Sequence, residues 1–140
     1  MATKIRAELS PKNKYWINKH RYYELKHFCL QYPLWKKIYL ALDDMYIPSS
    51  EIKIAISDTN THSDHTAKRA VAKTYYASKI KMIERMATQA DSELSDYILK
   101  AVTEELSYSY LKTKMNIPCG RDTYYDRYRK FFWLLSKERQ

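Results

Sequence analysis

The chain contains a single glycine, Gly120, among its 140 residues, and only four prolines. Glycine and proline most often end helices and form tight turns, so most of this sequence has no turn signal. A β-sandwich or barrel needs many short strands separated by such turns. The sequence therefore predicts an all-α protein built from long helices.

Apolar side chains recur every three or four residues along most of the chain, which is the period of an amphipathic helix. The pattern predicts a basic N-terminal arm and helical hairpin in residues 1–45, a linker in 46–66 and a long helix in 65–90. Within the linker, residues 51–56 alternate as in a strand, but one strand alone makes no sheet. Residues 91–140 form a three-helix unit, and the wide apolar band of the long helix makes it a candidate dimer interface.

Two predicted helices near the C-terminus are separated by a tight turn. Tyr108, Leu111 and Met115 share one face of the first helix. The turn contains Ile117, Pro118, Cys119 and Gly120. The second helix has one apolar stripe, formed by Tyr124, Tyr128, Phe131, Phe132 and Leu135. Two helices joined by a few residues, with the second one basic on its free face, are the outline of a helix-turn-helix motif.

The free face of this second helix carries the side-chain types that read DNA. The predicted contact residues are Arg121, Asp122, Thr123, Tyr125, Asp126, Arg127, Arg129 and Lys130. The arginines and the lysine are expected to contact phosphate or guanine, while Tyr125, Thr123 and Asp126 set the choice of base. Gly120 either provides a backbone conformation that the turn needs or lets the backbone approach a phosphate. The alternative is an ordinary amphipathic helix with a solvated charged face.

The charge balance favours a polyanionic partner. The net charge is +9, which indicates nucleic acid first and a membrane surface second. Residues 91–106 carry five acidic residues and one basic residue, whereas residues 121–140 carry six basic and three acidic ones. Because acidic side chains should face away from phosphate, this segregation predicts that the C-terminal end contacts DNA.

Other classes of protein are disfavoured by what the sequence lacks. No apolar run approaches a membrane span, and the N-terminus has no signal-peptide core, so we expect a cytoplasmic protein without a membrane partner. Cys29 and Cys119 lie far apart without CxxC partners and are expected to be free thiols, with no metal site. No acid pair, nucleophile–base set or phosphate loop is present, so we expect neither an enzyme nor a cofactor.

Three segments of the chain carry a family resemblance. They read ELKHFCLQYPLWKK, LKAVTEELSYSYLK and IPCGRDTYYDRYRKFFWLLSK, and they lie between about residue 22 and residue 137. They resemble the RinA-type late-gene transcriptional regulators of tailed phages of Gram-positive bacteria, and the related ArpU-type proteins. The resemblance implies a C-terminal helix-turn-helix similar to region 4 of sigma factors. It also implies that Ile117 to Lys130 form the turn and recognition helix, with Arg121 to Lys130 in the major groove.

The expected function is therefore sequence-specific DNA binding, as a transcriptional regulator that activates phage or prophage late genes in a bacterial cytoplasm. The expected partners are double-stranded DNA, a second copy of the chain and the host RNA polymerase. Trp133 lies on the polar side of the last helix and is either a partner contact or packed on the N-terminal hairpin. Two alternatives stay open: a DNA-packaging recognition protein similar in role to a small terminase subunit, and an RNA-binding basic protein.

Overall fold

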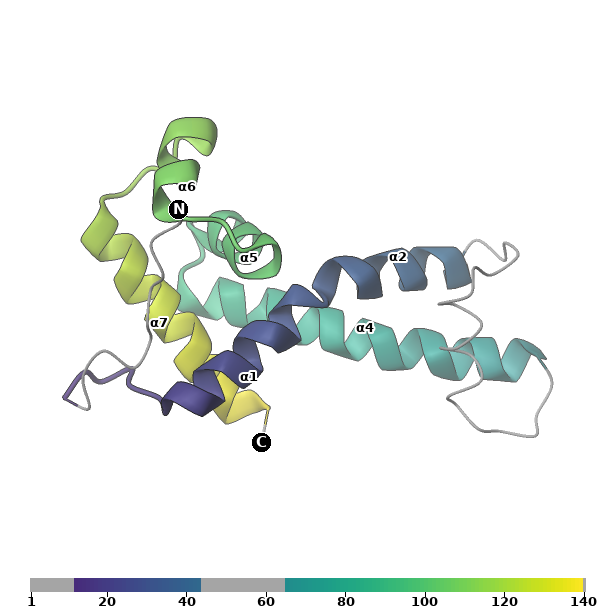
Figure 1. Cartoon of the computed structure of the whole chain (residues 1–140). Helices are drawn as coiled ribbons and strands as arrows, with labels where there is room; N and C mark the ends of the chain where they lie inside the picture. The colour runs from purple at the N-terminus through teal and green to yellow at the C-terminus, as the bar shows by residue number, and fades with distance from the viewer. Residues whose placement is uncertain (1–11, 44–64, 140) are drawn as a thin grey trace. The chain divides into compact units, whose positions relative to one another are not determined.

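Helices make up the regular secondary structure of the part of the chain that the structure describes (Figure 1). The computed structural model describes residues 12–43 and 65–139. The helices are α1 (Lys19–Leu30), α2 (Tyr32–Asp43), α4 (His65–Ala90), α5 (Ser95–Glu104), α6 (Tyr108–Met115) and α7 (Arg121–Glu138). No strand occurs in the described residues, and the prediction of an all-α fold is confirmed. Most of the predicted arm and nearly all of the predicted linker, including the strand-like residues 51–56, lie outside the described residues.

Side-chain caps set the positions at which α1 and α6 begin. The Oδ1 atom of Asn18 accepts a hydrogen bond from the backbone N–H of His20 at 2.8 Å. The Oγ atom of Ser107 accepts one from the backbone N–H of Tyr110 at 3.1 Å. Each cap satisfies a backbone donor that the first turn of a helix leaves without an intrahelical partner. Apolar spacing alone does not specify these starting positions.

Two helices end on residues with a left-handed backbone. Glu105, after α5, has φ 57°, and Asn116, after α6, has φ 53°. Asparagine adopts this conformation more readily than most residues other than glycine. The left-handed conformation turns the following backbone N–H groups back toward the last helical turn. After α5, the N–H groups of Glu105 and Leu106 both donate to the carbonyl of Ala101. These reversals allow three helices to follow one another with only short connections.

Backbone contacts divide the chain into two compact units. The first combines Met1–Gln31 with Met82–Gln140 and so contains α1, the end of α4, and α5 to α7. The second is Tyr32–Lys81, which contains α2 and the beginning of α4. This division differs from the sequence-based prediction, which grouped α1 with α2 in an N-terminal hairpin. Each of α1 and α2 carries apolar side chains that could pack on any neighbouring helix. In the structure, α1 packs on α5 and α7.

The core of the first unit joins α1 to the C-terminal helices. Leu25 and Cys29 of α1 are fully buried, as are Ile98 of α5 and Phe131 and Phe132 of α7. In Figure 1, α1 lies against both α5 and α7. The predicted support for the helix-turn-helix motif therefore comes from the N-terminal part of the chain as well as from α5.

In the second unit α2 runs antiparallel to the beginning of α4 (Figure 1). Ile38, Leu42 and Ala72 form its buried centre, with Ala41 and Tyr76 partly buried against them. This small apolar core buries one side of each helix, and the other sides face solvent.

The role of α1 in the core can be tested with a matched pair of leucines. Leu25→Ala should lower the free energy of unfolding by about 2–5 kcal/mol, because it leaves a cavity at a site with no solvent exposure. Leu40→Ala on α2 should change it by less than about 0.5 kcal/mol, because Leu40 is 56% exposed. Urea unfolding followed by circular dichroism measures both. Equal effects of the two substitutions contradict the packing of α1 described here.

Candidate nucleic-acid interface

The connection between α6 and α7 is held by a buried anchor and two hydrogen bonds. Ile117 is 1% exposed, and its backbone N–H donates to the carbonyl of Leu111 at 3.1 Å. The hydroxyl of Tyr108 donates to the carbonyl of Cys119 at 2.7 Å. The turn is thus fixed at both of its ends, so α6 and α7 keep a defined relation to each other.

The left-handed position in this connection belongs to Asn116 rather than to Gly120. Gly120 has φ −79° and ψ 172°, which is extended backbone that any residue can adopt. A Cβ atom placed on Gly120 would meet nothing within 4 Å. Of the two roles predicted for Gly120, a special backbone conformation is therefore wrong. Its second role, a close approach of the backbone to phosphate, stays a prediction, and Gly120 is exposed as that role requires.

The apolar stripe of α7 is buried as its spacing predicts. Tyr124, Phe131, Phe132 and Leu135 have no solvent exposure, and Tyr128 has 8%. The rings continue into α1, where Tyr22 lies 5.1 Å from Phe132 between centroids. The hydroxyls of Tyr22 and Tyr128 form a hydrogen bond at 2.8 Å, and burial raises the pKa of Tyr128 well above its usual value. The rotation of α7 about its axis is therefore set by its aromatic side.

The first turn of α7 points three of the predicted contact residues into solvent, namely Arg121, Asp122 and Thr123. The guanidinium of Arg121 lies 5.3 Å from the ring centre of Tyr108 and 5.7 Å from that of Tyr125. Its Nη1 atom also donates to the Tyr125 hydroxyl at 3.1 Å. Two tyrosines therefore hold this cation at the exposed end of the helix, and Gly120 contributes no side-chain cap over the amides of the first turn.

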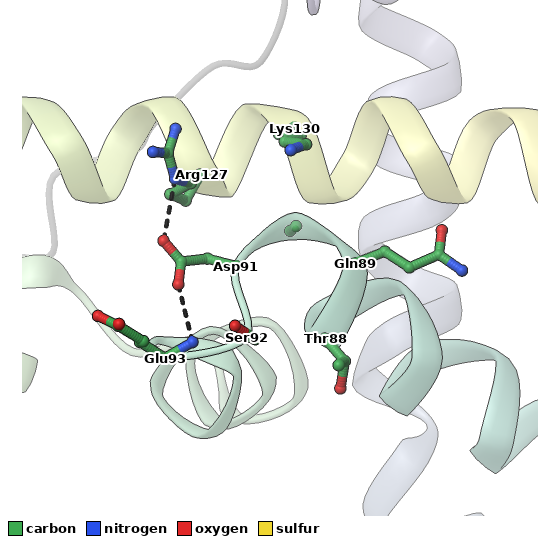
Figure 2. A pocket seen from close by; sticks show the side chains of 8 residues that line it. Thr88, Gln89, Asp91, Ser92, Glu93, Arg127 and Lys130 are labelled. Atoms are coloured by element: carbon green, nitrogen blue, oxygen red, sulfur yellow. Dashed lines mark hydrogen bonds and ion pairs between the residues drawn. The ribbon is translucent and has the colours of Figure 1, made fainter.

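Arg127 is engaged inside the protein. Its Nε atom donates to the Oδ2 atom of Asp91 at 3.0 Å (Figure 2). Its Nη1 atom pairs with Asp126. The other carboxylate oxygen of Asp91 accepts from the backbone N–H groups of Glu93 and Leu94, at 2.9 and 3.0 Å. Arg127 thus ties α7 to the connection between α4 and α5. These pairs give Arg127 a structural role, while its contact with DNA stays a prediction.

The electrostatics of Asp91 agree with this role. Burial alone would raise the pKa of Asp91, but the hydrogen bonds from Leu94, Arg127 and Glu93 outweigh burial and lower it. The hydrogen bond to Asp91 comes first among the causes that raise the pKa of Arg127. The two groups therefore stabilise each other's charged forms in the folded protein.

Arg129 and Lys130 are half-buried. The Nε atom of Arg129 is buried without a hydrogen-bond partner among the described residues. Lys130 lines a shallow depression at the α4–α5 connection together with Thr88 (Figure 2). At about 100° per residue, Lys130 projects from the opposite side of α7 to Arg121. The eight predicted contact residues therefore cannot all face one groove.

The sequence-based prediction missed the cations of α6. Lys112 and Lys114 are exposed in the last turn of α6, beside exposed Thr113. The sequence shows both lysines, but the prediction considered only the apolar face of this helix. We use the name α6–α7 interface for the exposed polar residues around this turn. They are Lys112, Thr113, Lys114, Arg121, Asp122 and Thr123.

The acidic residues of the α5 region are partly neutralised within the first unit. Glu105 pairs with Lys26 at 2.8 Å, and Glu104 lies 3.9 Å from Lys100. The α6–α7 interface, in contrast, contains three cations and Asp122 as its one anion. Positive side chains therefore outnumber negative ones among the exposed polar residues around the turn.

Trp133 packs within the first unit. Its ring lies 5.3 Å from that of Tyr15, in a T-shaped contact, and the Nζ atom of Lys137 lies 3.5 Å from its ring centre. Of the two predicted roles, the structure favours packing on the N-terminal part of the chain. Tyr15 precedes α1, however, so the contact is with the entry to that helix rather than with a hairpin.

Neither a membrane-spanning helix nor a cluster of metal ligands is found in the described residues. No helix in residues 12–43 or 65–139 combines the length and apolar character needed to cross a membrane. Those same residues bring together no group of three or more potential metal ligands from His, Cys, Asp and Glu. The chain matches no protein-family model, no curated protein and no solved structure. The resemblance to RinA-type regulators therefore stays a prediction carried by the sequence motifs.

The ion pair between Asp91 and Arg127 yields a stability prediction. Asp91→Ala should lower the free energy of unfolding by about 1–3 kcal/mol, because it leaves Arg127 and two backbone N–H groups without their acceptor. The folded pKa of Asp91 is lowered, so its contribution is present above the ordinary pKa of about 4 and is lost as pH falls through the folded value.

Urea unfolding of wild type and variant at neutral pH and at about pH 3 measures this difference. It should shrink in acid. Asp122→Ala serves as the control, because Asp122 is exposed in the first turn of α7 and forms no ion pair among the described residues. A difference that is the same at both pH values contradicts the role of the Asp91 charge.

Proposed function

We propose that this protein binds double-stranded DNA sequence-specifically through the α6–α7 interface and acts as a transcriptional regulator. The observation that carries the proposal is the first turn of α7. It exposes Arg121, Asp122 and Thr123 while the next residue, Tyr124, is completely buried. A short α6, a turn with a buried anchor and a longer α7 rooted in an aromatic core provide the rigid support that base recognition needs.

The residues of the α6–α7 interface have two proposed roles, namely to hold the protein on the phosphate backbone and to read the bases. Lys112 and Lys114 would contact phosphates on one side of the groove, where their charge contributes without regard to sequence. Arg121, already held between two tyrosine rings, would donate to the edge of a guanine or to a phosphate. Asp122 and Thr123 would select bases beside it. The amides of the first turn of α7 favour an anion at the same end of the helix.

Three of the other predicted residues act from behind this surface. Arg127, through Asp91, and the aromatic stripe hold the orientation of α7. Tyr125 and Asp126 are half-buried: Tyr125 positions Arg121, and Asp126 pairs with Arg127. Substitutions at these positions are therefore expected to alter binding through the placement of Arg121 or of the helix.

The finer features of the proposal come from the resemblance to RinA-type regulators. By that resemblance, the regulated genes are phage or prophage late genes in a bacterial cytoplasm, and the protein acts as an activator beside the host RNA polymerase. Pairing of two copies on two half-sites belongs to the same proposal, because helix-turn-helix proteins commonly bind as dimers. A packaging recognition protein would instead form a ring, and the mass of the protein in solution separates the two.

Arg121→Ala tests the α6–α7 interface directly. Binding sites are first selected from a random duplex library with the wild-type protein. The variant should bind the selected site about tenfold more weakly, or by about 1–2 kcal/mol, and should show relaxed preference at one position. Its helical content should be unchanged, because Arg121 is exposed.

The control is Lys19→Ala, which removes the same charge from an exposed position at the start of α1. It should leave the preference for the selected site intact. Absence of any enriched duplex sequence contradicts the proposed function. Equal binding to duplex RNA and duplex DNA points to the RNA-binding alternative instead.

A further inference from the structure

Two arginines of the described chain are exposed, and their surroundings differ. They are Arg85 and Arg121. Arg85 pairs with the carboxylate of Glu138, which offsets its charge. Arg121 has no carboxylate partner among the described residues and lies beside two tyrosine rings instead. Its positive charge is therefore left to a ligand, although its side chain is held in place.

The two rings come from different helices. Tyr108 belongs to α6 and is buried, whereas Tyr125 belongs to α7 and is half-buried. Their planes meet at 69°, with 6.2 Å between ring centres. The guanidinium of Arg121 lies within cation–π distance of both rings. Two rings that stand at a large angle restrict the guanidinium from two directions, so its orientation is limited.

The rings are themselves fixed by the core behind them. Tyr124 has no solvent exposure, and its ring centre lies 5.6 Å from that of Tyr108 and 5.4 Å from that of Tyr125. The hydroxyl of Tyr108 also donates to the carbonyl of Cys119 at 2.7 Å. A contact group held by packed side chains keeps its geometry before the ligand arrives.

Most of the donors of Arg121 remain available. A guanidinium carries several N–H donors in a planar fork. One of them, on Nη1, donates to the hydroxyl of Tyr125 at 3.1 Å. The others form no hydrogen bond among the described residues. The side chain can therefore present two donors to a ligand while Tyr125 keeps its own hydrogen bond.

A fixed planar fork matches guanine better than phosphate. In the major groove, guanine presents the O6 and N7 acceptors side by side, and arginine meets both with two donors. This contact needs a defined orientation, whereas a flexible lysine serves a phosphate as a point charge. Lys112 and Lys114 of the α6–α7 interface are exposed and supply that kind of charge. The tyrosine-held arginine is the residue suited to a base.

We propose that Arg121 reads a guanine of the bound duplex through two N–H donors, with Tyr108 and Tyr125 as the positioning residues that hold its guanidinium for this contact. The inference rests on the proposed function, because it names a base that the α6–α7 interface recognises. It predicts that the site selected by the wild-type protein contains a required G·C pair.

Arg121→Lys separates a guanine contact from a phosphate contact, because it keeps the charge and removes the fork. On the selected site, its preference for guanine at one position should fall about tenfold or more. Its affinity for random duplex, and the dependence of that affinity on salt, should equal those of wild type. The control is Arg85→Lys, the same substitution at the other exposed arginine, which should retain the preference.

A modified base identifies the acceptor. In 7-deazaguanine the N7 atom is replaced by C–H, so one of the two acceptors is lost. The wild-type protein should bind a selected site that carries this base at the required position several-fold more weakly than the ordinary site. Arg121→Ala should bind the two duplexes equally, since it has no donor at that position.

The tyrosines are tested by Tyr125→Leu, which removes the half-buried ring and the hydroxyl beside Arg121. The preference for guanine should fall, while the affinity for random duplex stays at the wild-type value. Tyr108→Leu should act in the same direction, with circular dichroism to verify its helices. The control is Tyr23→Leu, at a half-buried tyrosine of α1. A purely structural role of Tyr125 would change stability in the same way as the control and leave the preference intact.

Four results overturn the inference and leave the proposed function standing. A selected site without a required G·C pair removes the guanine. Full preference in Arg121→Lys assigns Arg121 to a phosphate. An equal loss for wild type and Arg121→Ala on 7-deazaguanine assigns the base to another residue. Full preference in Tyr125→Leu and in folded Tyr108→Leu removes the positioning role. If the wild-type protein enriches no duplex sequence, the proposed function itself fails, and this inference fails with it.

Discussion

The aromatic contact between α7 and α1 determines how the rest of the first unit is presented. Tyr124, Tyr128, Phe131 and Phe132 are buried, and Tyr22 of α1 meets this stripe through a ring contact and a hydroxyl hydrogen bond. A buried aromatic side chain contributes several kcal/mol, which is comparable to the whole stability of a small domain. Because these rings fix one side of α7, they also decide which residues the opposite side can offer. The exposed first turn of α7 is a consequence of that packing.

Cations of the first unit have two kinds of surroundings. Arg127, Lys26 and Arg85 have carboxylate partners and help to hold helices together. Around the α6–α7 turn, positive side chains outnumber negative ones, and Arg121 lies near two tyrosine rings. Net charge alone does not distinguish a structural arginine from one available to a ligand. The distance to the nearest carboxylate distinguishes the two.

The sequence predicts those features that depend on neighbouring residues. The stripe on α7 follows from the helical period, and the all-α class follows from the scarcity of glycine. The engagement of Arg127 could not be predicted, because Asp91 lies 36 residues away and meets it only after folding. The packing of α1 on α7 was missed for a similar reason, since amphipathic helices have interchangeable apolar sides. A special backbone conformation was predicted for Gly120, but the left-handed residue of the turn is Asn116. The sequence carries no equally specific signal for a left-handed asparagine.

The reactivity of the two cysteines reports on two different local openings of the folded protein. Cys29 has no solvent exposure, and burial raises the pKa of its thiol, so neither access nor the reactive thiolate is available in the native core. Cys119 lies in the α6–α7 turn and is only half-buried, with a pKa that burial also raises. A thiol reagent should therefore modify Cys119 during local openings of the turn and Cys29 only when α1 separates from α7. The unmodified chain thus contains one chemical reporter for each of these motions.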